Sequence, residues 1–258
     1  MTAPIPRDIP DLPALQGAPA LLPSPVPATA VVTPVRRPVT AAFRLLTALA
    51  AATAVTVELL LGSPAEVLSR FTIQSGILLI LVMTISSHRA WTARHPLPPA
   101  LTGATLLYVV IAALVHHLLL ADASSPFAAP SPPGGWHTIT HQILHTAVPI
   151  AALTNWLLLT APGDLHLRRT ATWLIYPLAY LAFSLARGEL ILPGTPGRYL
   201  YLFLDVDQHG YKSVLANALL LGLAFYALAV LLVALDHIRP NPVRHRAKTG
   251  FRLGPPVG

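Results

Sequence analysis

Six long apolar segments, separated by short polar connections, make up most of the chain. Because an α-helix rises 1.5 Å per residue, about 20 apolar residues cross the roughly 30 Å hydrocarbon core of a bilayer. Strands of a membrane barrel are about half as long and alternate in polarity. The pattern therefore predicts an all-α, polytopic integral membrane bundle of six transmembrane helices within residues 39–236. The segments lie at about residues 39–61, 65–87, 100–121, 138–160, 171–192 and 212–235.

The second segment begins with a helix start signal. Ser63 is a typical N-cap, Pro64 suits the first helical position, and Glu66 completes a capping box. Arg70 follows Glu66 by four residues, so we expect the two side chains to pair. If one helix begins here at the membrane surface, Thr72 lies about nine residues, or roughly 13 Å, below that surface.

Two tails flank the six segments. Ten of the 27 prolines fall within residues 1–38, a region without a continuous apolar core. This composition predicts a solvated, disordered cytoplasmic tail and does not resemble a signal peptide. Residues 237–258 are basic and are expected to form a second cytoplasmic tail. The predicted organisation is therefore one membrane domain between two tails.

The composition agrees with a membrane protein. Apolar residues make up 54% of the chain and charged residues only 10%, whereas about 25% of an ordinary soluble domain is charged, so a soluble enzyme domain is excluded. The chain has no cysteine, which excludes disulfides, thiolate metal sites and a cysteine nucleophile. The net charge of +7 lies mainly at segment ends and in the tails. We therefore expect the lipid bilayer, and no nucleic acid, as partner.

The basic residues also predict an orientation. If the N-terminus is cytoplasmic, all 17 Lys and Arg residues except Arg70, Arg187, Arg198 and Lys212 lie on the cytoplasmic side. Cytoplasmic loops of membrane proteins carry an excess of Lys and Arg. We therefore expect a multi-pass protein of the cell membrane with both termini in the cytoplasm. The sequence does not indicate an oligomeric state.

Strongly polar residues within the segments collect in the outer half of the membrane. Such residues are costly in hydrocarbon and usually face the bundle interior or a wet cavity. His145 lies about two turns into an apolar segment, where it needs a partner. A polar pocket in the outer half explains this placement. The residues concerned are Glu58, Thr72, Gln74, Ser75, His116, His117, His141, His145, Tyr176, Tyr180, Ser184, Arg187 and Asn217.

Each of these residues also has a purely structural explanation. Glu58 and Arg187 can extend to the membrane interface. Thr72 and Ser75 can donate hydrogen bonds to carbonyl groups of their own helix. The tyrosines of the fifth segment can pack between helices. The collective placement, more than any single residue, therefore carries the prediction of a pocket.

Several segments, in this order, carry a resemblance to a known family. The chain resembles the bacterial, largely actinobacterial, branch of the androgen-induced membrane proteins over roughly residues 40–236. That family has six helices, and its animal members hydrolyse fatty acid esters of hydroxy fatty acids. The resemblance therefore implies a lipid-ester hydrolase. The matching segments are FTIQSGILL (71–79), HQILHTAVP (141–149) with NWLLL (155–159), WLIYPLAYLAFSLARG (173–188) and FLDVDQHGY (203–211).

The resemblance also implies site residues. Animal members use an intramembrane threonine nucleophile and a histidine, and the matching positions here are Thr72 and His145. Two departures are visible. His141 and His145 are four residues apart, where the animal pattern has three, and Gly76 stands where bacterial members generally carry Asn.

The chemistry of such a pair makes further demands. A threonine hydroxyl is a weak nucleophile and needs an adjacent base to accept its proton. A third group usually orients the base, and hydrogen-bond donors stabilise the oxyanion. The side chains that remain open for these roles are Glu58, Asp205, Asp207, Gln74, Tyr180 and Asn217.

Two other classes of function fit the same pattern. A non-catalytic protein that binds a lipid or another small molecule needs the same pocket. An intramembrane metal or haem protein is the other class, because His141 and His145 share a helix face and His116 and Glu58 lie in the same half of the membrane. The chain has no HExxH motif and no histidines paired at matching depths for haem. We therefore predict no metal ion and no cofactor.

Overall fold

The computed structural model describes residues 35–121, 125–127, 134–195 and 197–240. The two predicted tails lie outside the described residues, except for residues 35–38 and 237–240. Every regular element within the described ranges is a helix, which confirms the all-α class. Five helices there are long and apolar enough to cross a membrane, as expected of an integral membrane protein.

The membrane-length helices match five of the six predicted segments. Gly210, at φ = +70°, breaks the last of them near its start, so its long part begins at Tyr211; glycine adopts this φ without steric cost. The five are α2 (Pro38–Leu61), α4 (Phe71–Trp91), α5 (Pro99–Val115) with the π-helical η1 (His116–Leu120), the run of α6 (Trp136–Gln142), η2 (Ile143–Ala147, also π-helical) and α7 (Val148–Leu159), and α10 (Val206–Ile238).

The predicted segment 171–192 is divided in the structure. It follows the short 3-10 helix η3 (Leu167–Arg169) and forms α8 (Thr170–Trp173) and α9 (Ile175–Leu190). With 16 residues, α9 is about 24 Å long, which is shorter than the hydrocarbon core. The all-α class with several membrane-length apolar helices is thus confirmed, and the count of six spans stays a prediction.

The second predicted segment contains a break that the sequence analysis missed. Residues 65–87 are not one helix, because α3 (Pro64–Ser69) ends at Arg70, whose φ of −77° and ψ of 133° are extended, and α4 begins at Phe71. Ser63 occupies the N-cap of α3, but its side chain makes no capping hydrogen bond. Glu66 instead accepts from Arg70 at 2.9 Å, as expected. Thr72 is therefore the second residue of its helix, and the assumption of one continuous helix, on which its estimated depth rested, is wrong.

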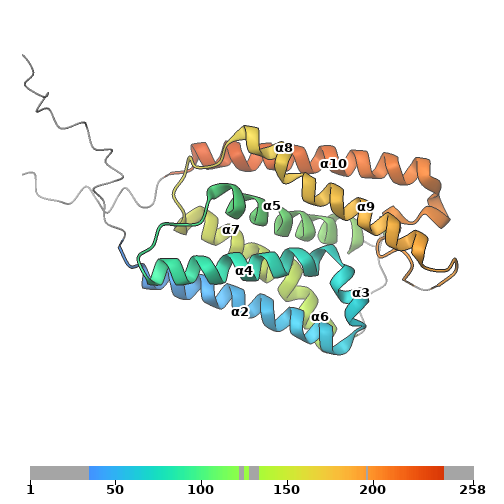
Figure 1. The fold of residues 1–258 in the computed structure, drawn as a ribbon, viewed down its shortest axis with the longest axis horizontal. Helices are drawn as coiled ribbons and strands as arrows, with labels where there is room; N and C mark the ends of the chain where they lie inside the picture. Colours follow the sequence, from blue (N-terminus) through green and yellow to red (C-terminus); the bar gives the residue numbers. More distant parts are fainter. Residues whose placement is uncertain (1–34, 122–124, 128–133, 196, 241–258) are drawn as a thin grey trace, which may run out of the picture. The chain divides into compact units, whose positions relative to one another are not determined.

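Small side chains allow α2 and α4 to pack closely side by side (Figure 1). The buried positions of α2 recur every three to four residues and include Ala41, Ala48, Ala51 and Ala54. On α4, Gly76 faces this surface, where an added Cβ would lie 3.7 Å from Val55. Close backbone approach through small residues is how membrane helices gain packing energy when the surrounding lipid is equally apolar.

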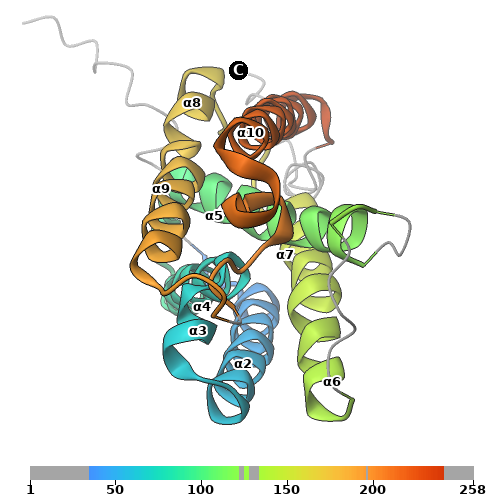
Figure 2. The same ribbon diagram turned by 90° about the vertical axis from the view of Figure 1, so that its right-hand side faces the viewer.

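Alternating helix directions bring three chain segments to one end of the bundle, which we call the α3 end. These segments are α3, the first turns of α6, and the connection of residues 191–205 with its short 3-10 helix η4 (Leu202–Leu204) (Figures 1 and 2). The connection packs tightly on α9, since a Cβ at Gly188 would overlap the Tyr199 ring.

A buried ion pair stabilises the end of the bundle opposite the α3 end. Asp236 of α10 is 1% exposed and lies 2.8 Å from Arg239 Nη2. It also accepts a hydrogen bond from the Leu165 backbone N–H at 2.9 Å. Arg239 in turn donates to the carbonyl groups of Trp156 and Ala161. The pair therefore joins α10 to α7 and to the connection that follows α7.

We expect Asp236→Ala to lower the free energy of unfolding by about 3–5 kcal/mol, because it leaves the Arg239 charge buried without a partner. Thermal unfolding in detergent measures the change. Asp164→Ala is the control, because burial raises the pKa of Asp164 and the nearby Asp236 raises it further. Removing Asp164 should therefore be neutral or slightly stabilising. Equal losses in the two variants would contradict the role of the buried pair.

Candidate functional site

Thr72 and His145 meet between α4 and η2. Thr72 lies in the first turn of α4, because that helix begins only after the extended Arg70. His145 is the middle residue of the π-helical η2 and is buried. The Thr72 Oγ1 atom lies 3.2 Å from His145 Nε2. The structure therefore brings together the two residues that the family resemblance implies as nucleophile and base.

A backbone carbonyl sets the tautomer of His145. Its Nδ1 atom lies 3.2 Å from the carbonyl oxygen of His141, one turn earlier. Since a carbonyl only accepts, Nδ1 carries the proton and Nε2 presents its lone pair to the Thr72 hydroxyl, which donates. The His141 carbonyl thus orients His145, a role for which the sequence analysis had considered carboxylates.

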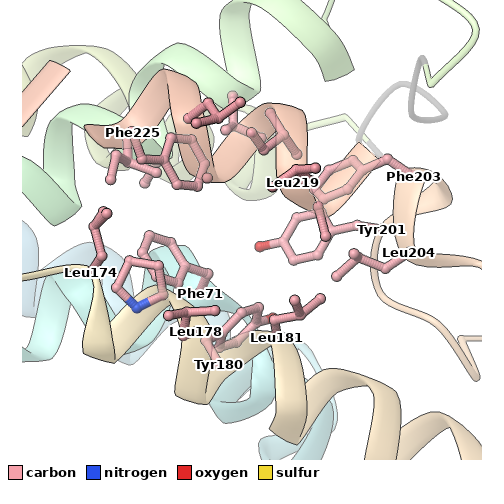
Figure 3. Close-up of a pocket in the computed structure, with 18 of the residues that line it drawn as sticks. Phe71, Leu174, Leu178, Tyr180, Leu181, Tyr201, Phe203, Leu204, Leu219 and Phe225 are labelled. Carbon is pink, nitrogen blue, oxygen red and sulfur yellow. The ribbon is translucent and has the colours of Figure 1, made fainter. Parts of the chain in front are cut away.

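A cavity of about 460 Å³ lies beside this pair, between α9 and α10 (Figure 3). Its volume falls within the range of small-molecule sites. Leucine and phenylalanine side chains such as Leu178, Leu219 and Phe225 form most of its wall. The predicted pocket was polar, whereas this cavity is mostly apolar. The polar side chains in the wall are Thr72, His116, His145, Tyr180, Tyr201 and Tyr226.

Tyr201 brings a hydroxyl group into the cavity from the connection between α9 and α10 (Figure 3). Burial raises the pKa of this hydroxyl, while the nearby Phe71 backbone and Thr72 side chain oppose the rise. The group is therefore protonated at neutral pH and can donate a hydrogen bond beside Thr72. Tyr180 packs below it and donates to the Ser69 carbonyl at 2.9 Å.

The start of α4 adds a favourable electrostatic environment for negative charge. The first N–H groups of a helix have no acceptor within that helix, and the helix dipole places partial positive charge there. Arg70, at the N-cap, provides no side-chain cap. Thr72 therefore lies where backbone donors can stabilise an oxyanion.

Glu58 anchors this break in the chain from α2. Its carboxylate is 3% exposed and lies 3.6 Å from Arg70 Nη1. It accepts a hydrogen bond from the Thr140 hydroxyl and lies 3.2 Å from His137 Nδ1, both on α6. Arg70 also pairs with Glu66. Glu58 thus joins α2, α6 and the start of α4, and is a positioning residue for Thr72.

Two further residues expected in the pocket belong to the first turns of α4 and do not line the cavity. Gln74 accepts from the Tyr176 hydroxyl at 3.0 Å and donates to the Leu68 carbonyl at 3.0 Å. Ser75 is 1% exposed and donates to the Thr72 carbonyl at 3.0 Å. Both side chains therefore stabilise the local backbone around Thr72.

Three other expected pocket residues stabilise the connection between α9 and α10, and they do not line the cavity either. Arg187 donates to two carbonyl groups of this connection, each at 3.0 Å. Asp205 caps α10 by accepting from the Asp207 and Gln208 N–H groups. Asn217 donates weakly to the Phe203 carbonyl at 3.5 Å.

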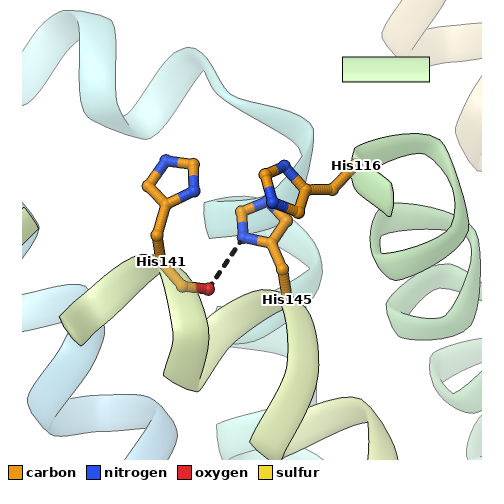
Figure 4. A group of neighbouring side chains, drawn as sticks. All are labelled: His116, His141 and His145. Carbon is orange, nitrogen blue, oxygen red and sulfur yellow. Dashed lines mark hydrogen bonds between the residues drawn. The ribbon is translucent and has the colours of Figure 1, made fainter. Parts of the chain in front are cut away.

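His145 forms a cluster of three histidines with His116 and His141 (Figure 4). The His116 ring centroid lies 4.1 Å from that of His145, and the His141 ring stacks on His145 at 4.6 Å. One ring nitrogen from each residue lies within 4.8 Å of the other two. Within the described residues, this cluster is the group that could hold a metal ion. The sequence analysis had predicted no metal ion.

Sequence reasoning missed Tyr201. The signal was present, because Tyr199, Tyr201 and Phe203 alternate in a connection between two apolar segments. His116 was expected both among the polar residues of the pocket and as a candidate metal ligand, and it does line the cavity. Adjacent helix positions point about 100° apart, so which of His116 and His117 faces inward depends on the π turn of η1, which the sequence did not predict.

No family model matches the chain, and no curated protein or solved structure matches it. The functional interpretation therefore rests on the geometry of this site and on the segments quoted above.

The anchoring role of Glu58 predicts a stability difference between two glutamates that both contact Arg70. We expect Glu58→Gln to lower the free energy of unfolding by about 1–3 kcal/mol, since it weakens buried, charge-assisted hydrogen bonds. Glu66→Gln, whose side chain is 42% exposed, should cost about 0–1 kcal/mol. Thermal unfolding in the same detergent compares them, and a larger loss for Glu66→Gln would contradict the anchoring role.

Proposed function

We propose that the protein is an intramembrane lipid-ester hydrolase in which Thr72 is the nucleophile and His145 the general base. The observation that carries the proposal is the 3.2 Å contact between Thr72 Oγ1 and the unprotonated Nε2 of His145. A hydroxyl in hydrogen-bond reach of a base that is itself held by a second acceptor is the arrangement of an activated nucleophile. The family resemblance supports the same two residues independently of this distance.

The reaction proceeds in two steps. Thr72 Oγ attacks the ester carbonyl carbon while its proton moves to His145 Nε2, giving a tetrahedral oxyanion. The C–O bond to the alcohol then breaks, and His145 returns the proton to the departing alkoxide. Water attacks the resulting acyl-threonine with His145 again as base, which releases the fatty acid and restores Thr72.

Two groups are suited to stabilise the oxyanion. The backbone N–H groups of the first turn of α4 lie around Thr72 and carry the positive end of the helix dipole. The protonated Tyr201 hydroxyl, which enters the cavity that Thr72 also lines, is the second donor. Donors fixed before the reaction in a water-poor site are typically worth about 10²–10³ in rate each.

The mostly apolar cavity favours an acyl chain as the part of the substrate that it binds. Its wall between α9 and α10 consists mainly of leucine and phenylalanine side chains. Burying an acyl chain there contributes about 0.8 kcal/mol per CH₂ group relative to water. A lipid that already lies in the bilayer gains less, so the cavity acts mainly by aligning the ester with Thr72.

Substitution of the two reacting residues tests the proposal. With p-nitrophenyl palmitate as substrate, Thr72→Val and His145→Gln should lower kcat/KM at least about 100-fold, whereas Thr72→Ser should stay within about tenfold. Thr154→Val is the matched control, because Thr154 only donates to the Ile150 carbonyl on α7. Undiminished hydrolysis by purified Thr72→Val protein would exclude Thr72 as nucleophile.

We further propose that α9 is the sixth span and that both termini are cytoplasmic. The α3 end, which carries Arg70, Arg187 and Arg198, then faces outward together with the site. The other Lys and Arg residues except Lys212 lie on the cytoplasmic side, as the positive-inside rule requires.

Single-cysteine labelling tests this orientation, because the natural chain has no cysteine to remove. An impermeant maleimide should label Thr195→Cys in intact cells, since Thr195 is an exposed residue between α9 and α10. The exposed His95, between α4 and α5, is the counterpart: His95→Cys should react only after permeabilisation. Protection of Thr195→Cys in intact cells would contradict six spans in this orientation.

A further inference from the structure

The histidine cluster has unused hydrogen-bonding capacity. The Nδ1 atoms of His116 and His141 are buried and have no hydrogen-bond partner within the described residues. A buried polar atom without a partner costs free energy, and such an atom in a native structure requires an explanation. Neither the proposed hydrolysis nor the packing of the helices uses these two nitrogens.

We propose that His116, His141 and His145 form a binding site for a divalent first-row transition metal ion, with Zn²⁺ as the best match. Imidazole nitrogen is a preferred ligand of Zn²⁺, whereas Ca²⁺ and Mg²⁺ require oxygen ligands. Three histidines with a fourth position left for a solvent or substrate group are a known zinc ligand set. The ligands come from three elements: His116 begins η1, while His141 and His145 lie one turn apart on the consecutive α6 and η2.

The observed spacing is compatible with such a site after a small closure. Tetrahedral Zn²⁺ with bonds of about 2.0–2.1 Å holds its ligand nitrogens roughly 3.3 Å apart. The three histidine nitrogens lie within 4.8 Å of one another, so side-chain rotation must bring them together by up to about 1.5 Å. The rings already face one another, with His116 and His141 centroids 5.2 Å apart.

Metal binding and the hydrogen bond that the Thr72 hydroxyl donates to His145 exclude each other. A neutral imidazole has one lone pair. If the ion takes Nε2 of His145, Thr72 loses its acceptor directly. If the ion takes Nδ1, the proton must move to Nε2, which then donates and cannot accept. The site itself does not depend on the proposed hydrolysis, but inhibition of turnover by the metal would rest on it.

Metal titration without any activity assay tests the site. Protein purified through a tag free of histidine and stripped with a chelator should bind one equivalent of Co²⁺, with the visible absorption of a tetrahedral complex. Zn²⁺ should displace the Co²⁺, in line with its higher affinity for such sites. His116→Ala and His141→Ala should each weaken binding at least tenfold. His88→Ala, at an exposed position near the far end of α4, should bind as the natural protein does.

A second variant tests the exclusion and keeps all three ligands. Thr72→Val removes the hydrogen bond that competes for His145, so it should tighten Co²⁺ binding several-fold. Unchanged affinity in Thr72→Val would overturn the mutual exclusion. Failure of the natural protein to bind stoichiometric metal, or equal binding by the His88 and cluster variants, would overturn the site. Either result leaves the hydrolase proposal standing, because Thr72-dependent turnover is measured separately.

Discussion

The hydrogen bond between Thr72 and His145 depends on two departures from regular α-helix. Arg70 is extended, so α4 begins at Phe71 and presents Thr72 in its first turn. His145 lies in the π turn of η2, and the His141 carbonyl accepts from its Nδ1, which leaves Nε2 directed toward Thr72. One continuous helix over residues 64–91 would place Thr72 mid-helix, away from the free N–H groups of a helix start. The candidate chemistry therefore follows from where the helices are interrupted.

The surrounding polar groups make these interruptions tolerable inside a membrane. Backbone and side-chain polar groups in hydrocarbon must find partners within the protein. Glu58 meets this need for the Arg70 break, and His117 does so for η2, where its Nε2 lies 3.2 Å from the His145 carbonyl. Most polar residues near the site are thus occupied in holding the backbone. The few that face the cavity, chiefly Thr72, Tyr201, His116 and His145, are the ones available for chemistry.

The sequence predicted the all-α fold class and the pair of Thr72 and His145 better than the helix breaks, the polarity of the pocket and the role of Tyr201. Hydropathy identifies membrane-length helices because the bilayer fixes their length, and five were confirmed. Helix breaks were not predicted, since the signal from Ser63 to Glu66 marks a start and the stop at Arg70 has no Gly or Pro. Pocket polarity was misjudged because a polar residue within a span was assumed to face a cavity, whereas Glu58, Gln74 and Ser75 face neighbouring backbone or side chains. Tyr201 was missed because it lies in a connection, outside the apolar segments from which the pocket was predicted.

The most direct measurement of the central claim is covalent capture of the nucleophile. A fluorophosphonate with a long alkyl chain should modify the purified protein, and peptide mass spectrometry should locate the adduct on Thr72. Excess long-chain ester should slow the labelling, and His145→Gln protein should resist it, because the hydroxyl then lacks its base. An adduct on another residue, or a folded protein that the probe leaves unmodified, would contradict the account and favour a protein that binds lipid without hydrolysing it.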